Sequence, residues 1–216
     1  DFFGRPKEHI LRVVQPLVPL IDCEGNFALK APLSLAEKPG GHGVLWRLML
    51  IKHVFPWLHE KKIAHVIIRQ INNPLGGTDS ALLALVGLGS YEKKLFGFAS
   101  CPRRDGLAEG LNVLKVKKEE RYHSSLSNLE YTAFNAILKE DPSFFSRQTF
   151  FANTNLLYAH VTTMEEFARR IVAPGALVNL KSEFSLFQKG ETVRRKACRL
   201  ESTMQNIADE IQTVSE

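Results

Sequence analysis

The sequence predicts an α/β fold, a mixed sheet with flanking helices, and two observations support this class. Apolar runs with strand character alternate with segments of helical spacing, and turns rich in glycine, asparagine and proline separate them. The chain has 216 residues, 44% of them hydrophobic, which is enough to bury a full core. No repeat, low-complexity segment or proline-rich linker interrupts the pattern, so we expect residues 1–216 to belong to one domain.

The first quarter of the chain is predicted to pair short strands and then to form two helices. Residues 12–21 are extended and apolar, and a Glu-Gly-Asn turn at residues 24–26 leads to a short returning strand at 27–29. A helix follows at about residues 43–53. Pro56 can begin a second short helix, because the first helical turn does not need its missing N–H.

The rest of the chain alternates strands and helices. A buried strand at residues 65–70 ends in an Asn-Asn-Pro turn, and Thr78 with Asp79 can cap a helix at 80–88, which makes a βα unit. We further expect strands at 95–100, 110–116 and 150–157, and helices at about 162–171 and 200–211. In open α/β sheets ligands bind beyond the carboxyl ends of strands, where several of these turns fall.

The composition limits the possible partners and compartment. A net charge of +5 comes mostly from basic clusters at residues 115–118 and 194–196. Such clusters usually form a solvated surface, and the alternative is an acidic partner such as a polyphosphate nucleotide. Nucleic acid is disfavoured, because no base-reading motif accompanies these clusters. The odd number of scattered cysteines indicates reduced thiols, and the histidines show no metal-site spacing. No signal peptide or membrane-spanning run is found, so we expect a soluble, cytoplasmic protein.

The most informative segment is K-P-G-G-H-G at residues 38–43, which opens onto a helical run. Glycines expose their N–H groups and reach positive φ, and the start of a helix adds its positive dipole end. The segment therefore suits a phosphate group or the edge of a nucleobase. The alternative is an ordinary glycine turn before a helix.

Further short motifs follow the same order as in one enzyme family. They are Q-P-L-V-P at residues 15–19, K-P-G-G-H-G at 38–43, N-N-P-L-G-G-T-D at 72–79, L-E-Y at 129–131, N-T-N at 153–155, V-N-L-K at 178–181 and R-L-E-S-T-M-Q-N at 199–206. Over nearly its whole length the chain resembles the UDP-sugar pyrophosphorylases, above all the plastid-type branch that feeds sulfolipid synthesis and its bacterial relatives. The resemblance implies a Rossmann-like, GT-A-like nucleotidyltransferase fold, and a location in the cytoplasm or, in a plant, the plastid stroma.

The resemblance implies the reaction and the nucleotide site. A sugar 1-phosphate, most simply glucose 1-phosphate, attacks the α-phosphorus of UTP and yields UDP-glucose and pyrophosphate. Such a reaction requires positioning and compensation of phosphate charge rather than a protein nucleophile. By the same resemblance Gln15 meets the uracil edge, Gly40 and Gly41 lie against uracil and ribose, and Asn73 also contacts the nucleotide. His42 is the expected catalytic residue, beside the α-phosphate. A surface glutamine and a buried, internally bonded histidine are the alternatives.

The resemblance also implies a sugar site. Asn153 matches the family asparagine that bonds the sugar hydroxyls, and Glu130 matches an acidic residue that faces the same sugar. Asn155 is the second candidate for the asparagine role. The alternative for both asparagines is a structural role, because asparagine often forms turns.

Three departures limit the resemblance. The family's glycine-rich phosphate loop does not occur before Gln15, and its basic phosphate contact beyond the R-L-E motif has no counterpart, so we expect residues 1–216 to be the central part of a catalytic domain. Where relatives carry an Asp-Asn pair that supplies a metal ligand, this chain has Asn72 and Asn73. We therefore assign no metal ligand and expect Mg²⁺ to arrive with UTP.

Two other functions remain open at this point. One is a nonenzymatic module of the same fold that binds nucleotide sugars or regulates an enzyme. The other is a basic scaffold that contacts nucleic acid through residues 115–118. The sequence leaves the identity of the sugar and the oligomeric state open, because pocket shape decides between sugars.

Overall fold

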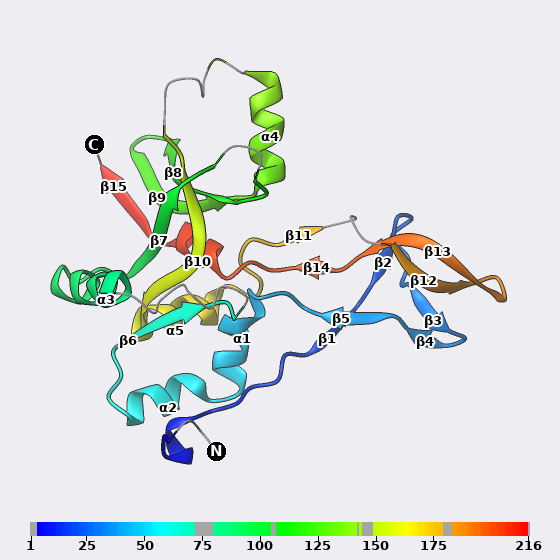
Figure 1. The fold of residues 1–216 in the computed structure, drawn as a ribbon, viewed down its shortest axis with the longest axis horizontal. Helices are drawn as coiled ribbons and strands as arrows, with labels where there is room; N and C mark the ends of the chain where they lie inside the picture. Colours follow the sequence, from blue (N-terminus) through cyan, green and yellow to red (C-terminus); the bar gives the residue numbers. More distant parts are fainter. Residues whose placement is uncertain are drawn as a thin grey trace. The chain divides into compact units, whose positions relative to one another are not determined.

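The structure is a computed structural model that describes residues 4–71, 80–104, 107–141, 143, 149–178 and 183–215 (Figure 1). The chain divides into two compact units. The first unit comprises Asp1–Trp57 and Ala168–Met204, and the second comprises Leu58–Phe167 and Gln205–Glu216. Each unit is therefore assembled from two separate stretches of sequence, which explains why no linker marks their boundary.

The second unit contains the large sheet. Its strands are β6 (His65–Arg69), β7 (Phe96–Pro102), β8 (Leu111–Lys118), β9 (Tyr122–Leu129), β10 (Phe151–His160) and β15 (Gln212–Ser215). The order is β15-β9-β8-β10-β6, β7 also pairs with β10, and every described pair is antiparallel. Strand β10 is central because it pairs with three others, and its buried residues Leu157, Tyr158 and Ala159 form part of the core.

Helices also belong wholly or partly to this unit. They are α2 (Val54–Glu60), which begins in the first unit, α3 (Ser80–Tyr91), α4 (Tyr131–Glu140), α5 (Val161–Arg170), which ends in the first unit, and the 3₁₀ helix η2 (Gln205–Glu210). Gly89 of α3 lies directly against Tyr158, because a Cβ at Gly89 would come 2.7 Å from the tyrosine ring. Phe134 of α4 is buried and packs edge-on against Phe150.

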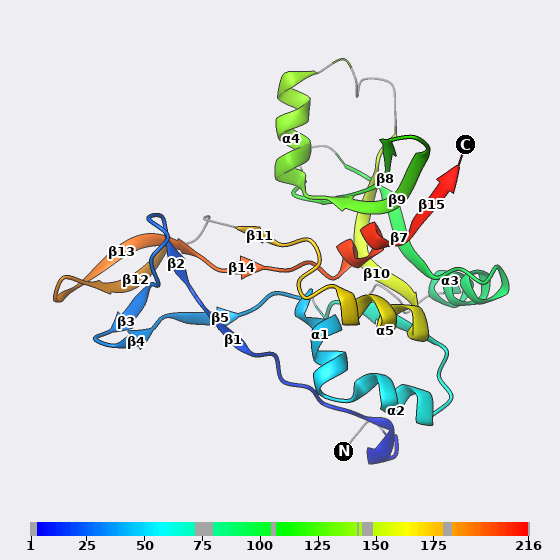
Figure 2. The same ribbon diagram turned by 180° about the vertical axis from the view of Figure 1, so that it is seen from behind.

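The first unit is built from small sheets and one buried helix. The strands are β1 (Leu17–Pro19), β2 (Ile21–Asp22), β3 (Leu29–Ala31), β4 (Ser34–Leu35), β5 (Glu37–Pro39), β11 (Leu177–Val178), β12 (Glu183–Gln188), β13 (Glu191–Cys198) and β14 (Leu200–Glu201), and the helices are η1 (Lys7–His9) and α1 (Val44–Ile51). Strands β12 and β13 form a long hairpin that β2 extends (Figure 2). Trp46 of α1 is fully buried, and its indole N–H donates to the carbonyl of Met204 at 2.9 Å.

The α/β class and most predicted elements are confirmed. Strands occur near residues 65–70, 95–100, 110–116 and 150–157, and helices near 43–53, 80–88 and 162–171, with ends shifted by a few residues. The helix at α2 begins at Val54 rather than at Pro56. The Asn72–Asp79 turn and its caps lie outside the described residues.

The predicted helix at residues 200–211 is wrong. Leu200 and Glu201 form β14 and pair with β11, and only Gln205–Glu210 is helical, as 3₁₀. The apolar residues whose spacing suggested a helix are only partly buried. Met204 and Ile207 are buried, whereas Leu200 is 55% exposed. Tertiary pairing with β11 outweighs the local pattern here. The sequence interpretation also missed α4 and the β12–β13 hairpin.

None of the helices in the described part of the chain is long and apolar enough to cross a membrane.

Candidate functional site

The predicted nucleotide residues lie together in the first unit. Strand β1 pairs with β5 through Leu17 and Pro39, so the residues just beyond each strand, Gln15 and Gly41, approach one another. The side-chain Nε2 of Gln15 donates a hydrogen bond to the carbonyl of Gly41. Gly40 is buried, and its N–H bonds the carbonyl of Pro16 at 3.3 Å. The structure thus joins the Q-P-L-V-P motif to the glycine loop.

The glycine loop packs against the backbone of Ser202. Gly41 has a φ of +90°, and a Cβ there would lie 3.0 Å from the carbonyl oxygen of Ser202. A Cβ at Gly43 would lie 2.1 Å from the Ser202 hydroxyl and 2.4 Å from its carbonyl carbon, and the Gly43 N–H bonds the Ser202 carbonyl at 2.8 Å. Internal packing therefore accounts for Gly43, the third glycine of the segment, to which the sequence interpretation had given no individual role.

His42 has one ring nitrogen engaged within the protein. Its Nδ1 accepts the backbone N–H of Met204 at 3.0 Å, so in the neutral ring the proton sits on Nε2. Burial lowers the pKa of His42 below 6.5, and the nearby Arg199 adds to this, while Glu201 acts in the opposite direction. The imidazole is thus kept neutral with an N–H donor at Nε2.

Two backbone donors of the loop are also available. Among the described residues, the N–H groups of Gly41 and His42 have no hydrogen-bond acceptor. Together with Nε2 of His42 they make three donors within two consecutive residues. A set of neutral donors of this kind suits phosphate oxygens or the carbonyl groups of a pyrimidine.

The predicted sugar residues lie together in the second unit, at an irregularity of β10. The register of β10 against β7 shifts between Asn153 and Leu156, and Asn155 adopts the left-handed conformation with φ +58°. The side-chain Oδ1 of Asn153 accepts the Asn155 backbone N–H at 2.9 Å, and the Asn153 side-chain N–H₂ donates to Oδ1 of Asn155, also at 2.9 Å. These two bonds fix both side chains relative to the bulge.

Glu130 reaches the same level of the sheet from another strand. Leu111 of β8 pairs with Leu129 on one side and with Ala152 on the other, so the next residues, Glu130 and Asn153, flank β8 at one end. They are separated by two strand spacings, or about 10 Å. Glu130 is exposed and stands just before α4, so its carboxylate is not used within the described part of the unit to cap that helix.

The sequence interpretation gave no role to Gln205, which the structure adds to the asparagine pair. Gln205 begins η2, is 3% exposed and donates its Nε2 to Oδ1 of Asn155. Its place in the R-L-E-S-T-M-Q-N motif was the only available signal, and no periodicity could link residues that are fifty positions apart. Asn73 lies outside the described residues.

Comparisons with known proteins identify similar sequences and folds. The chain is 38% identical over 218 residues to UTP–glucose-1-phosphate uridylyltransferase 3, chloroplastic, of Arabidopsis thaliana. It superposes on UDP-glucose pyrophosphorylase of Leishmania major with a TM-score of 0.67 at 19% identity, over 90% of this chain. The chain has the fold of the UDP-sugar pyrophosphorylases. A uridine diphosphate N-acetylglucosamine pyrophosphorylase of Trypanosoma brucei gives a TM-score of 0.69 at 20% identity, over 96% of this chain.

The resemblance to UDP-sugar pyrophosphorylases, stated from the motifs, is therefore confirmed. The chain covers only part of each relative: 96% of it aligns with 25% of the Arabidopsis protein, and it covers 41% and 39% of the Leishmania and Trypanosoma chains. No family model matches the chain.

The donors around His42 do not fit a metal ion held by the protein. Within the described ranges, no three His, Cys, Asp or Glu side chains gather where they could share a metal. The carboxylate whose charge acts on His42 belongs to Glu201, and Arg199 holds it at 3.0 Å. Nε2 of His42 and the N–H groups of Gly41 and His42 are donors, and a cation requires acceptors.

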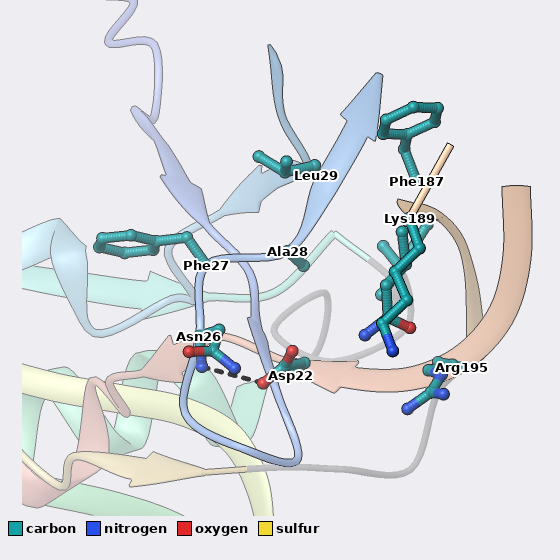
Figure 3. A pocket seen from close by; sticks show the side chains of 10 residues that line it. Asp22, Asn26, Phe27, Ala28, Leu29, Phe187, Lys189 and Arg195 are labelled. Carbon is teal, nitrogen blue, oxygen red and sulfur yellow. Dashed lines mark hydrogen bonds between the residues drawn. The ribbon is translucent and has the colours of Figure 1, made fainter. Parts of the chain in front are cut away.

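A separate pocket of about 260 Å³ lies in the first unit, away from these residues (Figure 3). Its walls come from the turn after β2 and from the β12–β13 hairpin. Asp22 and Asn26 lie on one side, joined by a hydrogen bond at 2.9 Å, and the charged ends of Lys189 and Arg195 lie on the other. Among the predicted site residues that the structure describes, none lines this pocket.

Proposed function

We propose that this chain is the nucleotide- and sugar-recognition part of a UTP–sugar-1-phosphate uridylyltransferase, with glucose 1-phosphate as the sugar substrate. The 38% identity to a UTP–glucose-1-phosphate uridylyltransferase of Arabidopsis supports this reaction. In the proposed reaction an oxygen of the sugar phosphate forms a bond to the α-phosphorus of UTP, and the bond to pyrophosphate breaks. UDP-glucose and pyrophosphate are the products.

The orientation of His42 carries the proposal. Its Nδ1 is occupied by the Met204 N–H, so Nε2 must donate, and burial keeps the ring neutral. A neutral imidazole with its proton on Nε2 can donate a hydrogen bond to a phosphate oxygen without first gaining a proton. This hydrogen bond strengthens as negative charge grows on that oxygen during attack. The ring needs no reorganisation for this role, because the backbone of Met204 already holds it.

The arrangement at Gln15 supports selectivity for uracil. Gln15 uses its Nε2 to bond Gly41, which leaves Oε1 as the acceptor of that amide. Uracil offers an N–H donor between two carbonyl acceptors, so Oε1 can accept the imide proton while a free backbone N–H, such as that of Gly41, meets a carbonyl. The Watson–Crick edge of adenine presents an acceptor where uracil has its imide donor, so ATP is expected to bind poorly.

The sugar would be bound by Asn153, Asn155 and Glu130 in the second unit. Amides offer both donors and acceptors to hydroxyl groups, and a carboxylate accepts from two neighbouring hydroxyls. We further propose that Mg²⁺ reaches the site as a complex with UTP, because the loop around His42 supplies donors rather than metal ligands. The magnesium then neutralises phosphate charge as part of the substrate.

Calorimetric titration of the 216-residue chain tests the proposal. We expect UTP and UDP-glucose to bind, with Mg²⁺ strengthening UTP binding, and ATP at the same concentration to give no heat. Comparison of the dissociation constants of UDP-N-acetylglucosamine and UDP-glucose gives the sugar preference. Equal binding of ATP and UTP would contradict uracil recognition. Binding of UDP-glucose without turnover in the protein that carries this chain would instead favour the nonenzymatic module.

A further inference from the structure

The side chain of Gln205 is the least explained feature of the amide cluster. It belongs to η2, whereas Asn153 and Asn155 belong to β10, so two distant stretches of the second unit meet here. Asn206, the next residue, anchors η2 to the sheet by donating to the carbonyl of Asn128 at 3.3 Å and to the hydroxyl of Ser127 at 3.4 Å. The backbone that carries Gln205 is therefore held against β9, and its side chain is directed to Asn155.

The hydrogen bonds determine which end of the Asn155 amide faces inward. Oδ1 of Asn155 accepts two donors, Nδ2 of Asn153 and Nε2 of Gln205. An asparagine amide has nearly the same shape at its oxygen and nitrogen ends, so only its hydrogen bonds decide its orientation. With both donors on the oxygen, the N–H₂ group of Asn155 is left to face away from Asn153 and Gln205. Among the described residues it has no acceptor.

Stability alone does not explain a glutamine at this position. Gln205 is 3% exposed, and its Oε1 is buried without a hydrogen-bond partner among the residues that the structure describes. A buried acceptor without a partner disfavours the folded state, and an apolar side chain of the same volume would avoid this. The amide is therefore retained at some expense to folding, which indicates a role for its donor.

We infer that Gln205 is a positioning residue for the sugar site, and this inference rests on the proposed function. Its Nε2 keeps Oδ1 of Asn155 turned inward, so that Asn155 presents N–H donors to the sugar. The left-handed backbone conformation at Asn155 fixes the direction in which its side chain leaves the strand. The hydrogen bond from Gln205 fixes which end of the amide, oxygen or nitrogen, faces the sugar. The site then offers donors to oxygen acceptors of a neutral sugar, such as its hydroxyl and ring oxygens.

Two substitutions separate positioning from structure. Gln205→Met keeps the volume and removes both the donor and the orphaned oxygen. Gln205→Glu removes the donor and places a carboxylate beside Oδ1 of Asn155, which favours the reversed amide. The control is Glu210→Gln, at the exposed end of the same 3₁₀ helix. The variants are made in the protein that carries this chain, with KM measured for glucose 1-phosphate and for UTP, and with urea unfolding as a second readout.

We expect Gln205→Met to raise KM for glucose 1-phosphate about tenfold, which is the equivalent of one hydrogen bond. KM for UTP should stay unchanged. The urea midpoint should stay unchanged or rise. Gln205→Glu should raise KM for glucose 1-phosphate further, and Glu210→Gln should leave it unchanged. A lower urea midpoint with both KM values unchanged would overturn the inference and make Gln205 purely structural. A parent protein that binds no UTP would remove the proposed function and this inference together, which the unsubstituted control reveals.

Discussion

The two clusters of predicted site residues are held in different ways. In the first unit the glycine loop is fixed by close packing of backbone on backbone, because Gly41 and Gly43 leave no room for a Cβ beside Ser202. In the second unit Asn153, Asn155 and Gln205 are fixed by side-chain hydrogen bonds around a strand bulge. The first cluster is thus specified by shape and the second by donor and acceptor pairing.

This difference predicts different sensitivities to substitution. A shape-specified loop has no tolerance for added atoms, since densely packed backbone cannot move aside. A hydrogen-bonded cluster tolerates changes that preserve the fold but loses the orientation of its side chains. Substitutions in the loop should therefore affect folding, and substitutions in the amide cluster should affect ligand binding with little effect on folding.

Gly43→Ala should have the largest effect. Its Cβ would lie 2.4 Å from the Ser202 carbonyl carbon, a backbone atom that cannot rotate away. We expect a loss of about 3 kcal/mol or more in the free energy of unfolding, at or above the upper end for overpacking. Urea unfolding followed by tryptophan fluorescence measures this loss, because Trp46 and Trp57, the two tryptophans of the chain, both belong to the first unit.

Gly87→Ala is the control for Gly43→Ala, and its urea unfolding is followed by circular dichroism because Gly87 belongs to the second unit. Gly87 lies in α3, where a Cβ would meet nothing within 4 Å, so alanine should be neutral or stabilising by up to about 1 kcal/mol through its helix propensity. The double variant Gly43→Ala/Ser202→Gly sharpens the test, since it removes the hydroxyl contact but keeps the backbone one. Full recovery of stability in that double variant would contradict the claim that backbone packing specifies the loop.

His42→Ala should lower turnover by about a hundredfold, the effect of removing one donor to a developing oxyanion. The UTP dissociation constant should change less, because the substitution leaves the backbone donors and Gln15 in place. Steady-state kinetics and calorimetry on the protein that carries this chain measure the two quantities, with His9→Ala, on an exposed 3₁₀ turn, as the control. Equal turnover in His42→Ala would remove the residue from the mechanism.

Asn153→Ala should raise KM for the sugar 1-phosphate about tenfold and leave UTP binding intact. The variant loses the two bonds between Asn153 and Asn155, each of the order of 1 kcal/mol, while the bond from Gln205 to Asn155 remains. Asn112→Ala on β8 is the matched control, since its amide bonds Ser100 at 2.7 Å and has no assigned role in the site. Loss of UTP binding with sugar binding retained would reverse the assignment of the second cluster.

The sequence predicted the fold class because the strands and helices of the second unit form where the spacing of apolar residues along the chain predicts them. The strand at residues 65–70 and the helix at 80–88 are set by local residues, and both occur. The failure at residues 200–211 has a different origin, since β14 depends on pairing with β11, more than twenty residues earlier in the chain. No local pattern encodes a partner strand at that distance.

The sequence grouped residues that the structure brings near one another, but it did not give their geometry or their supporting residues. Gln15 and Gly41 were placed in one nucleotide site, and the structure joins them directly. The motifs gave no indication that the backbone of Ser202 packs against the glycine loop, or that Gln205 bonds Asn155. Both residues come from the R-L-E-S-T-M-Q-N motif, which supplies Ser202 and Met204 to the first cluster and Gln205 to the second. Such contacts follow from tertiary packing, which spacing along one chain does not reveal.

Tyr158→Phe in the second unit and Trp46→Phe in the first unit compare a buried polar group that has no hydrogen-bond partner among the described residues with one that has a partner. Tyr158 is 1% exposed and burial raises its pKa, yet its hydroxyl has no partner in the described part of the second unit. Phenylalanine should therefore stabilise the protein by about 1 kcal/mol. Trp46→Phe is the opposite case, because Trp46 loses its bond to Met204 and should destabilise the protein. Thermal unfolding followed by circular dichroism measures both, and destabilisation by Tyr158→Phe would reveal a partner for the hydroxyl.

The smallest expected effect is a dependence of stability on pH through one histidine in each unit. Burial lowers the pKa of His42 and of His65 below 6.5, and at His65 the neighbouring His160 adds to the effect. In the unfolded chain both rings take up protons as the pH falls through about 6.5, whereas the folded rings remain neutral. The unfolded state then binds more protons, so stability is full above pH 6.5 and falls as the pH drops through the lowered folded pKa values.

Substitution of each histidine assigns this loss to one unit. Urea midpoints are measured from pH 8 to pH 5 for the parent, His42→Asn and His65→Asn, with tryptophan fluorescence following the first unit. His42→Asn should flatten the profile of the first unit, because a side chain that does not titrate contributes no difference in bound protons. His65→Asn should leave that fluorescence profile steep. If His42→Asn kept the full parental slope, the ring of His42 would already be protonated in the folded state near pH 6.5, and its role as a neutral donor would fail with it.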